Sequence, residues 1–474
     1  MLSGDRLERL LPYGLLAVFF CLSASLRPLL PVDETRYLSV AWEMYSRQSF
    51  LVPTLNFEPY FQKPPLLFWL IDGAWAAFGV SRISALLVIF AISSLVMVLT
   101  HRLAKELFPD AVGLERRVTW LLLGSAPFVI YSTLILFDLL LTACVLGAFL
   151  ALIAFARDGK VRYALLAGLS IGLGVLAKGP VVLIHVAFPI LLYPLWRQAH
   201  VSSARFLAGA GLALLVAGAV TLAWLGPALN STGSDFARGL VWEQAAGRIA
   251  GSAAGAHARP FYFYALLVPL VLLPWGLSRD LWISQPWRRI RDRNDVGPDD
   301  RRMLEFLAIW CLGELLVFSA ISGKQPHYLL PALPLIVMAF AYFMTKVRLF
   351  DLVATAIFML GLFTVGQTIA WATVFTHYDL QPVANFVKNN QQSELGYSGR
   401  YQGELTFLAR MNKPFEIVNP SEVKQWLRSH PSGYLVARAA HYPDDTRSVA
   451  FSQLVTSGYL IVLGDSYPAD VSMR

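Results

Sequence analysis

Two short segments near the start of the chain combine acidic, basic and aromatic side chains. Segment 33–37 reads Asp-Glu-Thr-Arg-Tyr and segment 60–65 reads Tyr-Phe-Gln-Lys-Pro-Pro, and both follow the first long apolar stretch. Ionisable side chains beside a membrane are costly unless they stay hydrated or take part in chemistry. A carboxylate can accept a proton or orient an acceptor, and a fixed lysine or arginine suits a phosphate. The two segments therefore predict an enzyme site at a membrane surface.

The residues in these segments also have purely structural interpretations. Asp33 could be the N-cap of a helix, with Glu34 favoured by the helix dipole. Lys63 could cover apolar surface with its stem while its ammonium group stays hydrated. Capping needs only one acid, however, and Lys63 lies between an aromatic run and a Pro-Pro pair. We therefore retain the chemical interpretation, in which Lys63 is a fixed cation at the mouth of a cavity.

Two later positions interrupt apolar sequence. Asp138 divides the stretch from Val118 to Phe155, which is too long for one membrane span, and Lys178 precedes a Gly-Pro pair. Asp138 marks either a tight turn between two helices or an active-site carboxylate. Lys178 fits a helix C-terminus that a cation stabilises and a glycine ends, and here the structural interpretation is favoured.

Two further clusters combine bases with aromatic residues. Segment 257–264 reads His-Ala-Arg-Pro-Phe-Tyr-Phe-Tyr and segment 322–328 reads Ser-Gly-Lys-Gln-Pro-His-Tyr. Each could anchor the chain at a membrane interface. A ring of such donors can also bind a phosphate headgroup. The candidate residues in these clusters are His257, Arg259, Lys324, His327 and Tyr328.

Apolar helices must position these residues. The 474-residue chain is 56% hydrophobic and only 15% charged, with a mean hydropathy of +0.54, which indicates a polytopic membrane protein rather than a soluble domain. Runs of about 20 apolar residues are long enough to cross a bilayer, and we expect about 11–13 such helices. They lie at roughly 10–30, 82–103, 117–136, 138–156, 162–178, 180–197, 205–226, 261–278, 303–321, 328–346 and 350–375, with 66–80 as a further candidate.

The net charge of +8 follows the predicted topology. If the N-terminus is cytoplasmic, twenty of the 39 lysines and arginines lie in short loops on that side, as the positive-inside rule expects. The basic balance therefore does not indicate nucleic-acid binding. The candidate site residues all emerge on the opposite side. The three cysteines lie in apolar spans, where thiols behave as small hydrophobic groups, and no disulfide is predicted.

We predict two domains. Residues 1–375 form a membrane domain, with outer loops at 31–80 and 227–260, and residues 376–474 form a small soluble α/β domain. Apolar spacing in the first loop predicts an amphipathic helix at 34–46 that lies in the interface, and a second such element at 66–80. The soluble region is expected to contain a helix at 381–388 and strands at 415–418, 434–436 and 459–463.

Several familiar motifs are absent. The sequence has no Asp-x-Asp pair, no phosphate-binding glycine loop, no dinucleotide-binding glycine pattern and no metal-binding Cys or His spacing. These absences argue against a nucleotide-linked donor, and no cofactor is predicted.

Segments 33–37, 58–65 and 177–180 together resemble the GT-C membrane glycosyltransferases of the protein-mannosyltransferase type. Within that superfamily the chain looks most like the bacterial branch that includes the lipid A aminoarabinose transferase, and the resemblance covers nearly the whole chain. It implies that Asp33, with Glu34 beside it, is central to catalysis and that Asp138 is a further active-site carboxylate. Donor-phosphate contacts would come from Arg36, Lys63, Arg259, Lys324 and Tyr328, and the pocket would also include Tyr37, Tyr60, Lys178, His257 and His327.

One departure concerns a metal. Aminoarabinose transferases commonly carry an acid immediately before the lysine of the Lys-Pro pair, where this chain has Gln62. The use of a divalent metal therefore stays open.

The resemblance implies a monomeric, inverting enzyme of the bacterial inner membrane with its active site on the periplasmic side. It would take a sugar from an undecaprenyl-phosphate donor and transfer it to lipid A, another envelope glycan or a protein. The same fold could serve a protein O-mannosyltransferase or a core-hexuronic acid transferase, and the sequence does not distinguish these substrates.

The rival of another class is a lipid or glycan transporter. Transporters place ionisable residues near the midplane and often have repeated halves, and this chain shows neither feature. A scaffold for envelope partners would leave Asp33, Lys63 and Asp138 unexplained.

Overall fold

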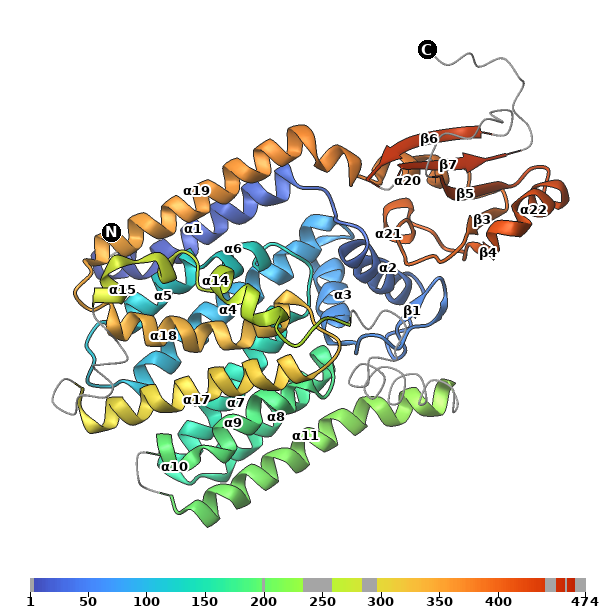
Figure 1. The fold of residues 1–474 in the computed structure, drawn as a ribbon. Coiled ribbons are helices and arrows are strands. Elements are labelled where there is room, and N and C mark those ends of the chain that lie inside the picture. Colours follow the sequence, from blue (N-terminus) through green and yellow to red (C-terminus); the bar gives the residue numbers. More distant parts are fainter. Residues whose placement is uncertain are drawn as a thin grey trace. The chain divides into compact units, whose positions relative to one another are not determined.

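The computed structural model describes residues 4–197, 201–232, 258–283, 296–439, 449–456 and 458–464 (Figure 1). The chain forms two compact units. The first, here called the helical unit, comprises Met1–Ser23, Phe61–Leu67 and Arg82–Val365. The second, here called the mixed unit, comprises Ala24–Tyr60, Phe68–Ser81 and Gly366–Arg474.

Among the described residues, eight helical segments are long and apolar enough to cross a membrane. The polytopic helical fold predicted from composition is therefore confirmed. These segments belong to α1 (Gly4–Leu26), α4 (Arg82–Leu107), α7 (Asp138–Asp158), α8 (Val161–Lys178), α11 (Ser203–Thr232), α17 (Pro298–Ala320), η3 with α18 (Pro326–Ala332 and Leu333–Phe343) and α19 (Leu349–Thr373).

The remaining predicted spans are helical but short or interrupted. Prolines lie at or near several of the breaks, including positions 127, 194 and 274, where the missing amide hydrogen and fixed φ angle favour a new helix start or a turn. The short elements are α3 (Leu66–Phe78), α5 (Leu114–Gly124), α6 (Ala126–Tyr131), α9 (Val181–Leu191), α10 (Tyr193–Trp196), α14 (Phe263–Val271), η2 (Trp275–Leu277) and α15 (Arg279–Ile283).

The basic loops meet at one end of the helical unit. Arg157 near the end of α7 forms an ion pair with Glu106 near the end of α4, at 3.0 Å. Arg117 on α5 donates to two backbone carbonyls that follow α18, at 3.0 and 2.7 Å. We call this the basic end. From there α7 runs back for 21 residues, about 31 Å, to Asp138 at what we call the Asp138 end.

The mixed unit contains a five-stranded sheet with the order β4-β3-β5-β7-β6. Strand β3 pairs in parallel with β4 and β5, whereas β7 pairs antiparallel with β5 and β6. Alternate residues of β5 face different cores: Val436 packs with the helix α20, and Leu435 packs with Trp426 of α22. Both faces of the sheet are therefore covered. The elements are η4 (Phe375–His377), α20 (Gln381–Asn389), β3 (Leu395–Ser398), α21 (Thr406–Ala409), β4 (Glu416–Val418), η5 (Pro420–Glu422), α22 (Val423–Ser429), β5 (Tyr434–Ala439), β6 (Val449–Val455) and β7 (Gly458–Leu463).

The helix predicted at 34–46 is present as α2 (Asp33–Ser46), but it is not a simple interfacial helix. Its polar residues Glu34, Thr35, Ser39 and Glu43 are buried together with its apolar ones. The hydroxyl of Ser39 donates to a backbone carbonyl at residue 403 and accepts the amide hydrogen of residue 407. Thus α2 packs into the C-terminal part of the mixed unit instead of presenting a hydrated polar face.

A two-residue hairpin turn is fixed against α2. Strands β1 (Thr54–Leu55) and β2 (Glu58–Pro59) are joined by Asn56 and Phe57, which have φ angles of +54° and +65°. Left-handed backbone is costly for residues other than glycine, although asparagine tolerates it. The carboxylate of Glu43 accepts both turn amide hydrogens at 2.8 Å, and the Asn56 amide pairs with the backbone of Phe415.

Candidate active site

Asp138 is the centre of a charged cluster in the helical unit. It is the first residue of α7, where a helix N-terminus favours a carboxylate, and only 2% of it is exposed. Its carboxylate forms an ion pair with Lys178, the last residue of α8. Nε2 of His327 lies 3.9 Å from its other oxygen. Three segments far apart in the sequence therefore meet at this carboxylate.

Lys178 stands at the helix end that the sequence suggested for it. It ends α8 and is followed by Gly179 at φ +81°, so the helix-terminus interpretation is confirmed. Its ammonium group also lies 4.4 Å from the centre of the Tyr328 ring, a cation–π distance. The neighbouring His327 ring packs edge-on against Tyr131, with ring centres 5.9 Å apart.

Lys63 lies next to the same cluster. Its ammonium group is 5.6 Å from the ring centre of Phe137, the residue immediately before Asp138. The segment Phe61–Leu67 belongs to the helical unit, although the residues on both sides of it belong to the mixed unit. With Lys63, Lys178 and His327 around one carboxylate, basic groups outnumber acidic ones here, which suits an anionic ligand.

Lys324 and Arg259 are joined by backbone contacts. Ala258 and Gly323 form an isolated β-bridge, and the Arg259 amide donates to the Ser322 carbonyl at 3.1 Å. The buried ammonium group of Lys324 donates to the Arg259 carbonyl at 2.9 Å and to a second carbonyl at residue 321. This arrangement favours a positioning role for Lys324 and leaves the exposed Arg259 side chain stacked on Phe263, 4.6 Å from its ring centre. The predicted site residue His257 lies outside the described residues.

Asp33 and Arg36 lie in the mixed unit. Asp33 is the first residue of α2 and the N-cap is Val32, which makes no capping hydrogen bond, so the capping interpretation of Asp33 is wrong. The Asp33 side chain is 56% exposed and lies 3.8 Å from the guanidinium of Arg36. Tyr37 donates to it at 3.4 Å. Arg36 is held by the Gln402 side chain at 2.6 Å.

Glu34 has a different environment from Asp33. Its buried carboxylate forms a two-point ion pair with Arg27 and accepts the Leu30 amide hydrogen at 2.9 Å. Both oxygens are therefore engaged, which favours a structural role over the catalytic role expected from the sequence. Tyr60 is also buried and packs edge-on against Phe68, with ring centres 6.5 Å apart.

Four residues of these surroundings were not predicted. Arg27 carried a usable signal, because it is a charge at the end of the first apolar span. Tyr131 and Phe137 look like ordinary span residues, and nothing in the sequence links Gln402 to Arg36. Among the described residues, no group of three or more His, Cys, Asp or Glu side chains could hold a metal ion.

Comparisons of sequence find similar proteins of one kind. Residues 62–224 match the family described as dolichyl-phosphate-mannose-protein mannosyltransferase. An undecaprenyl phosphate-alpha-4-amino-4-deoxy-L-arabinose arabinosyl transferase of Pseudomonas aeruginosa is 29% identical over 73% of this chain. A protein of the same name from Edwardsiella ictaluri is 29% identical over 65% of it. The matches span 60% and 54% of those relatives, so the chain covers little more than half of their length.

Comparison of structures extends the likeness to nearly the whole chain. The crystal structure of ArnT from Cupriavidus metallidurans in the apo state superposes with a TM-score of 0.74 over 97% of this chain and 98% of that one, at 14% identity. The structure of the same protein bound to undecaprenyl phosphate gives 0.72 over 96% and 97%, at 15% identity. The resemblance predicted from the short motifs is thus confirmed: this chain is a polytopic helical membrane protein that resembles the GT-C glycosyltransferases in sequence and has the fold of ArnT.

Proposed function

We propose that this chain is a membrane glycosyltransferase that moves a sugar from a polyprenyl-phosphate carrier to an acceptor. The observation that carries the proposal is the cluster at the Asp138 end, where Lys178, His327 and Lys63 gather around one buried carboxylate. The fold and the names of the relatives support the same reaction class.

The cationic cluster suits the leaving group. During transfer the bond between the anomeric carbon and the carrier phosphate breaks, and the electron pair leaves with the phosphate oxygen. Fixed cations stabilise the negative charge that develops there. We assign this role to Lys63, Lys178 and His327, with Arg259 and Tyr328 as further contacts. Asp138 holds Lys178 and His327 in position.

The acceptor oxygen forms the new bond to the anomeric carbon. If it is a hydroxyl, its proton must be removed, and Asp33 is the proposed general base because it is exposed and ionisable. If it is a phosphate oxygen that is already ionised, no base is needed and Asp33 orients the acceptor. Arg36, whose side chain Gln402 holds in place, is proposed as a phosphate contact from the motif resemblance alone.

The proposed donor is an undecaprenyl-phosphate-linked sugar. A solved protein of this fold binds undecaprenyl phosphate, and the curated relatives are named for transfer of 4-amino-4-deoxy-L-arabinose from that carrier. We propose lipid A as the acceptor, with core oligosaccharide or protein hydroxyls as the alternatives. Because this chain has Gln62 where aminoarabinose transferases commonly carry an acid, the identity of the transferred sugar should be tested directly.

The proposed location is the bacterial inner membrane. The basic end would face the cytoplasm according to the positive-inside rule, and the Asp138 end would then face the periplasm. The region 376–474 would be periplasmic as well. We propose that the enzyme acts as a monomer.

The test is mass spectrometry of lipid A, core oligosaccharide and other envelope glycans from cells that lack the gene and carry a variant copy. Wild type should restore a sugar that deletion removes. Asp138→Asn should lower its amount by about a hundredfold or more, because the cations lose their fixed partner. Asp33→Asn should also abolish transfer while leaving donor binding largely intact. Asp110→Asn, an exposed aspartate in the loop after α4, is the matched control and should behave as wild type.

Normal transfer by well-expressed Asp138→Asn or Asp33→Asn protein would remove that residue from the mechanism. An unchanged glycan profile, together with movement of a labelled lipid and no new glycosidic bond, would favour a transporter instead.

A further inference from the structure

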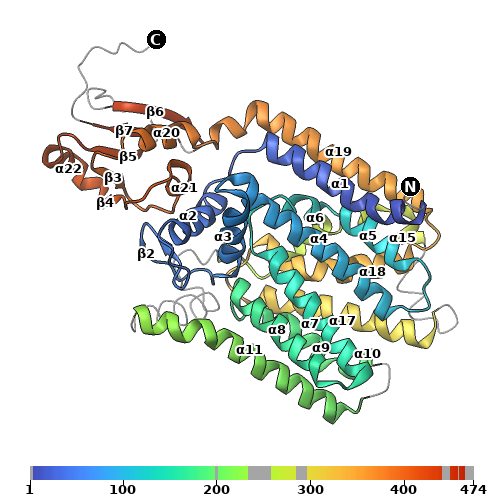
Figure 2. The ribbon, with the colours of Figure 1, turned by 180° about the vertical axis from the view of Figure 1, so that it is seen from behind.

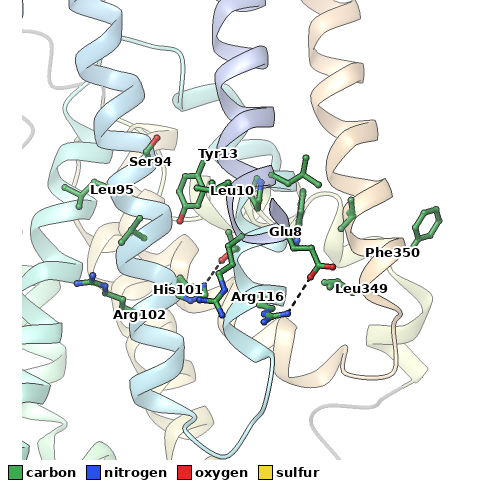
Figure 3. Close-up of a pocket in the computed structure, with 17 residues that line it drawn as sticks. Glu8, Leu10, Tyr13, Ser94, Leu95, His101, Arg102, Arg116, Leu349 and Phe350 are labelled. Atoms are coloured by element: carbon green, nitrogen blue, oxygen red, sulfur yellow. Dashed lines mark hydrogen bonds and ion pairs between the residues drawn. The ribbon is translucent and has the colours of Figure 1, made fainter. Parts of the chain in front are cut away.

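A pocket opens at the basic end of the helical unit. It is enclosed by α1, α4, α5 and α19, and its volume is about 700 Å³ (Figure 3). Figures 1 and 2 show α1 and α19 running side by side, with α4 and α5 next to α1. None of the residues proposed for sugar transfer lines this pocket.

The pocket has a charged rim and an apolar interior. Arg9, Arg102 and Arg116 line it together with His101, and Glu8 is the one acidic side chain among the described residues of the lining. Glu8 forms an ion pair with Arg116 at 3.7 Å, which leaves an excess of positive charge at the rim. In Figure 3 Arg102, His101 and Arg116 lie at one end, while Ser94, Leu95 and Tyr13 lie further along.

The depth of the pocket follows from α4. Arg102 and Ser94 are eight residues apart on this helix, so the lining extends about 12 Å from the basic end into the apolar zone. Leu95, Val98 and Val353 make this deeper part apolar. The Ser94 hydroxyl lies there without a hydrogen-bond partner among the described residues.

We propose that this pocket binds one anionic phospholipid, with its phosphate at the arginine rim and an acyl chain along the apolar part. Basic pockets between membrane helices attract anionic headgroups, and arginine pairs well with phosphate oxygens. A free phosphate would use the rim but not the apolar depth. A zwitterionic lipid would fill the depth but would gain less from the net positive rim.

The test is native mass spectrometry of the purified full-length protein, delipidated and then titrated with phosphatidylglycerol or phosphatidylcholine. One phosphatidylglycerol should remain bound to wild type under conditions that remove phosphatidylcholine. Replacing Arg9 and Arg102 together by glutamine should weaken its binding by roughly tenfold to thirtyfold. Both side chains are exposed, so the variant should fold normally. The matched control is the double replacement Lys160→Gln and Arg162→Gln, two exposed basic residues at the start of α8.

A second pair of variants tests the apolar part without changing charge. Ser94→Phe should fill the pocket and weaken phosphatidylglycerol binding, whereas Ser94→Ala should not. Neither change breaks a hydrogen bond with a described residue. If wild type and all variants retained both lipids equally, the bound lipid would be only nonspecific lipid around the protein. That result would overturn the proposal. If glycerol phosphate, which has no acyl chain, displaced all bound phosphatidylglycerol, the pocket would be a site for small anions and not for a lipid. Neither result depends on transferase activity.

Discussion

His185 and Glu314 form a fully buried polar pair between two helices of the helical unit. Nδ1 of His185 on α9 lies 2.6 Å from Oε1 of Glu314 on α17, and the indole of Trp310 donates to the same oxygen at 2.7 Å. Ionisable residues inside membrane helices are costly unless they are paired. The pair joins α9, which follows Lys178 closely, to α17, which precedes the segment that carries His327. It therefore holds in place two segments that supply the cluster around Asp138.

Two substitutions at Glu314 should distinguish the contribution of its hydrogen bonds to stability from the contribution of its side-chain volume. Glu314→Gln keeps an oxygen that can accept from both partners, so we expect only a small loss of stability. Glu314→Leu leaves the Trp310 and His185 nitrogens without an acceptor and should lower the free energy of unfolding by about 3 kcal/mol. Thermal unfolding in detergent measures both. Equal unfolding temperatures for the two variants would show that the hydrogen bonds contribute little.

The sequence identified residues that are chemically out of place more readily than residues that complete their surroundings. Asp138 and Lys178 were predicted because each interrupts an apolar stretch, and the structure brings them into one ion pair. Gln402 was not predicted, because its partner Arg36 lies 366 positions away and a lone glutamine in a polar region carries no signal. The buried pairing of Glu34 with Arg27, only seven positions apart, was missed although Arg27 is a charge at the end of the first apolar span.

At the level of elements, the contact between α2 and the β1–β2 hairpin depends on one buried carboxylate. Burial raises the pKa of Glu43 from 4.5 to about 7, although hydrogen bonds from the Asn56 and Phe57 amides oppose this shift. The folded state therefore holds the Glu43 proton more tightly than the unfolded state does. The stability linked to Glu43 is fully present below pH 4.5 and is lost as the pH rises through about 7.

The Glu43→Gln variant should reveal this dependence. Between pH 5 and pH 8 the free energy of unfolding of wild type should fall by up to about 3 kcal/mol relative to that of the variant, because glutamine cannot ionise. Unfolding midpoints of both proteins across this range give the difference. Glu58→Gln, an exposed glutamate in the same hairpin, should show no such trend. A wild-type-minus-variant difference that stays constant with pH would contradict the buried, proton-binding state of Glu43.

Element positions were predictable from apolar length, but their continuity was not. The run at 138–156 became the unbroken α7, whereas the run at 180–197 became the separate helices α9 and α10. Hydropathy measures only whether a segment tolerates lipid, and it is insensitive to backbone breaks at prolines. In the C-terminal region the helix α20 and strands β4, β5 and β7 lie where patterning predicted elements, but strands β3 and β6 gave no clear alternation.

At the level of the whole molecule, most of the first loop, apart from Phe61–Leu67, forms one compact unit with the C-terminal region. The sequence suggested a soluble tail that begins after the last span, because composition changes abruptly there. Composition cannot show that the tail shares its core with residues more than 300 positions earlier. Trp75 stacks on Phe407 with ring planes 4° apart, and the Trp42 indole donates to the Met411 carbonyl at 2.8 Å.

Removing residues 376–474 should therefore disturb the first loop as well as delete the tail. The truncated protein loses the partners of Ser39, Trp42 and Asn56, which leaves buried polar groups of the loop unsatisfied. We expect limited proteolysis to cut the truncated protein within 47–60 much faster than the full-length chain. Co-expression of 376–474 as a separate chain should restore protection, because the contacts need proximity and not covalent continuity. Equal resistance of the truncated and full-length proteins would show that the first loop folds without the tail. In that case the C-terminal region would be the independent domain that its composition suggests.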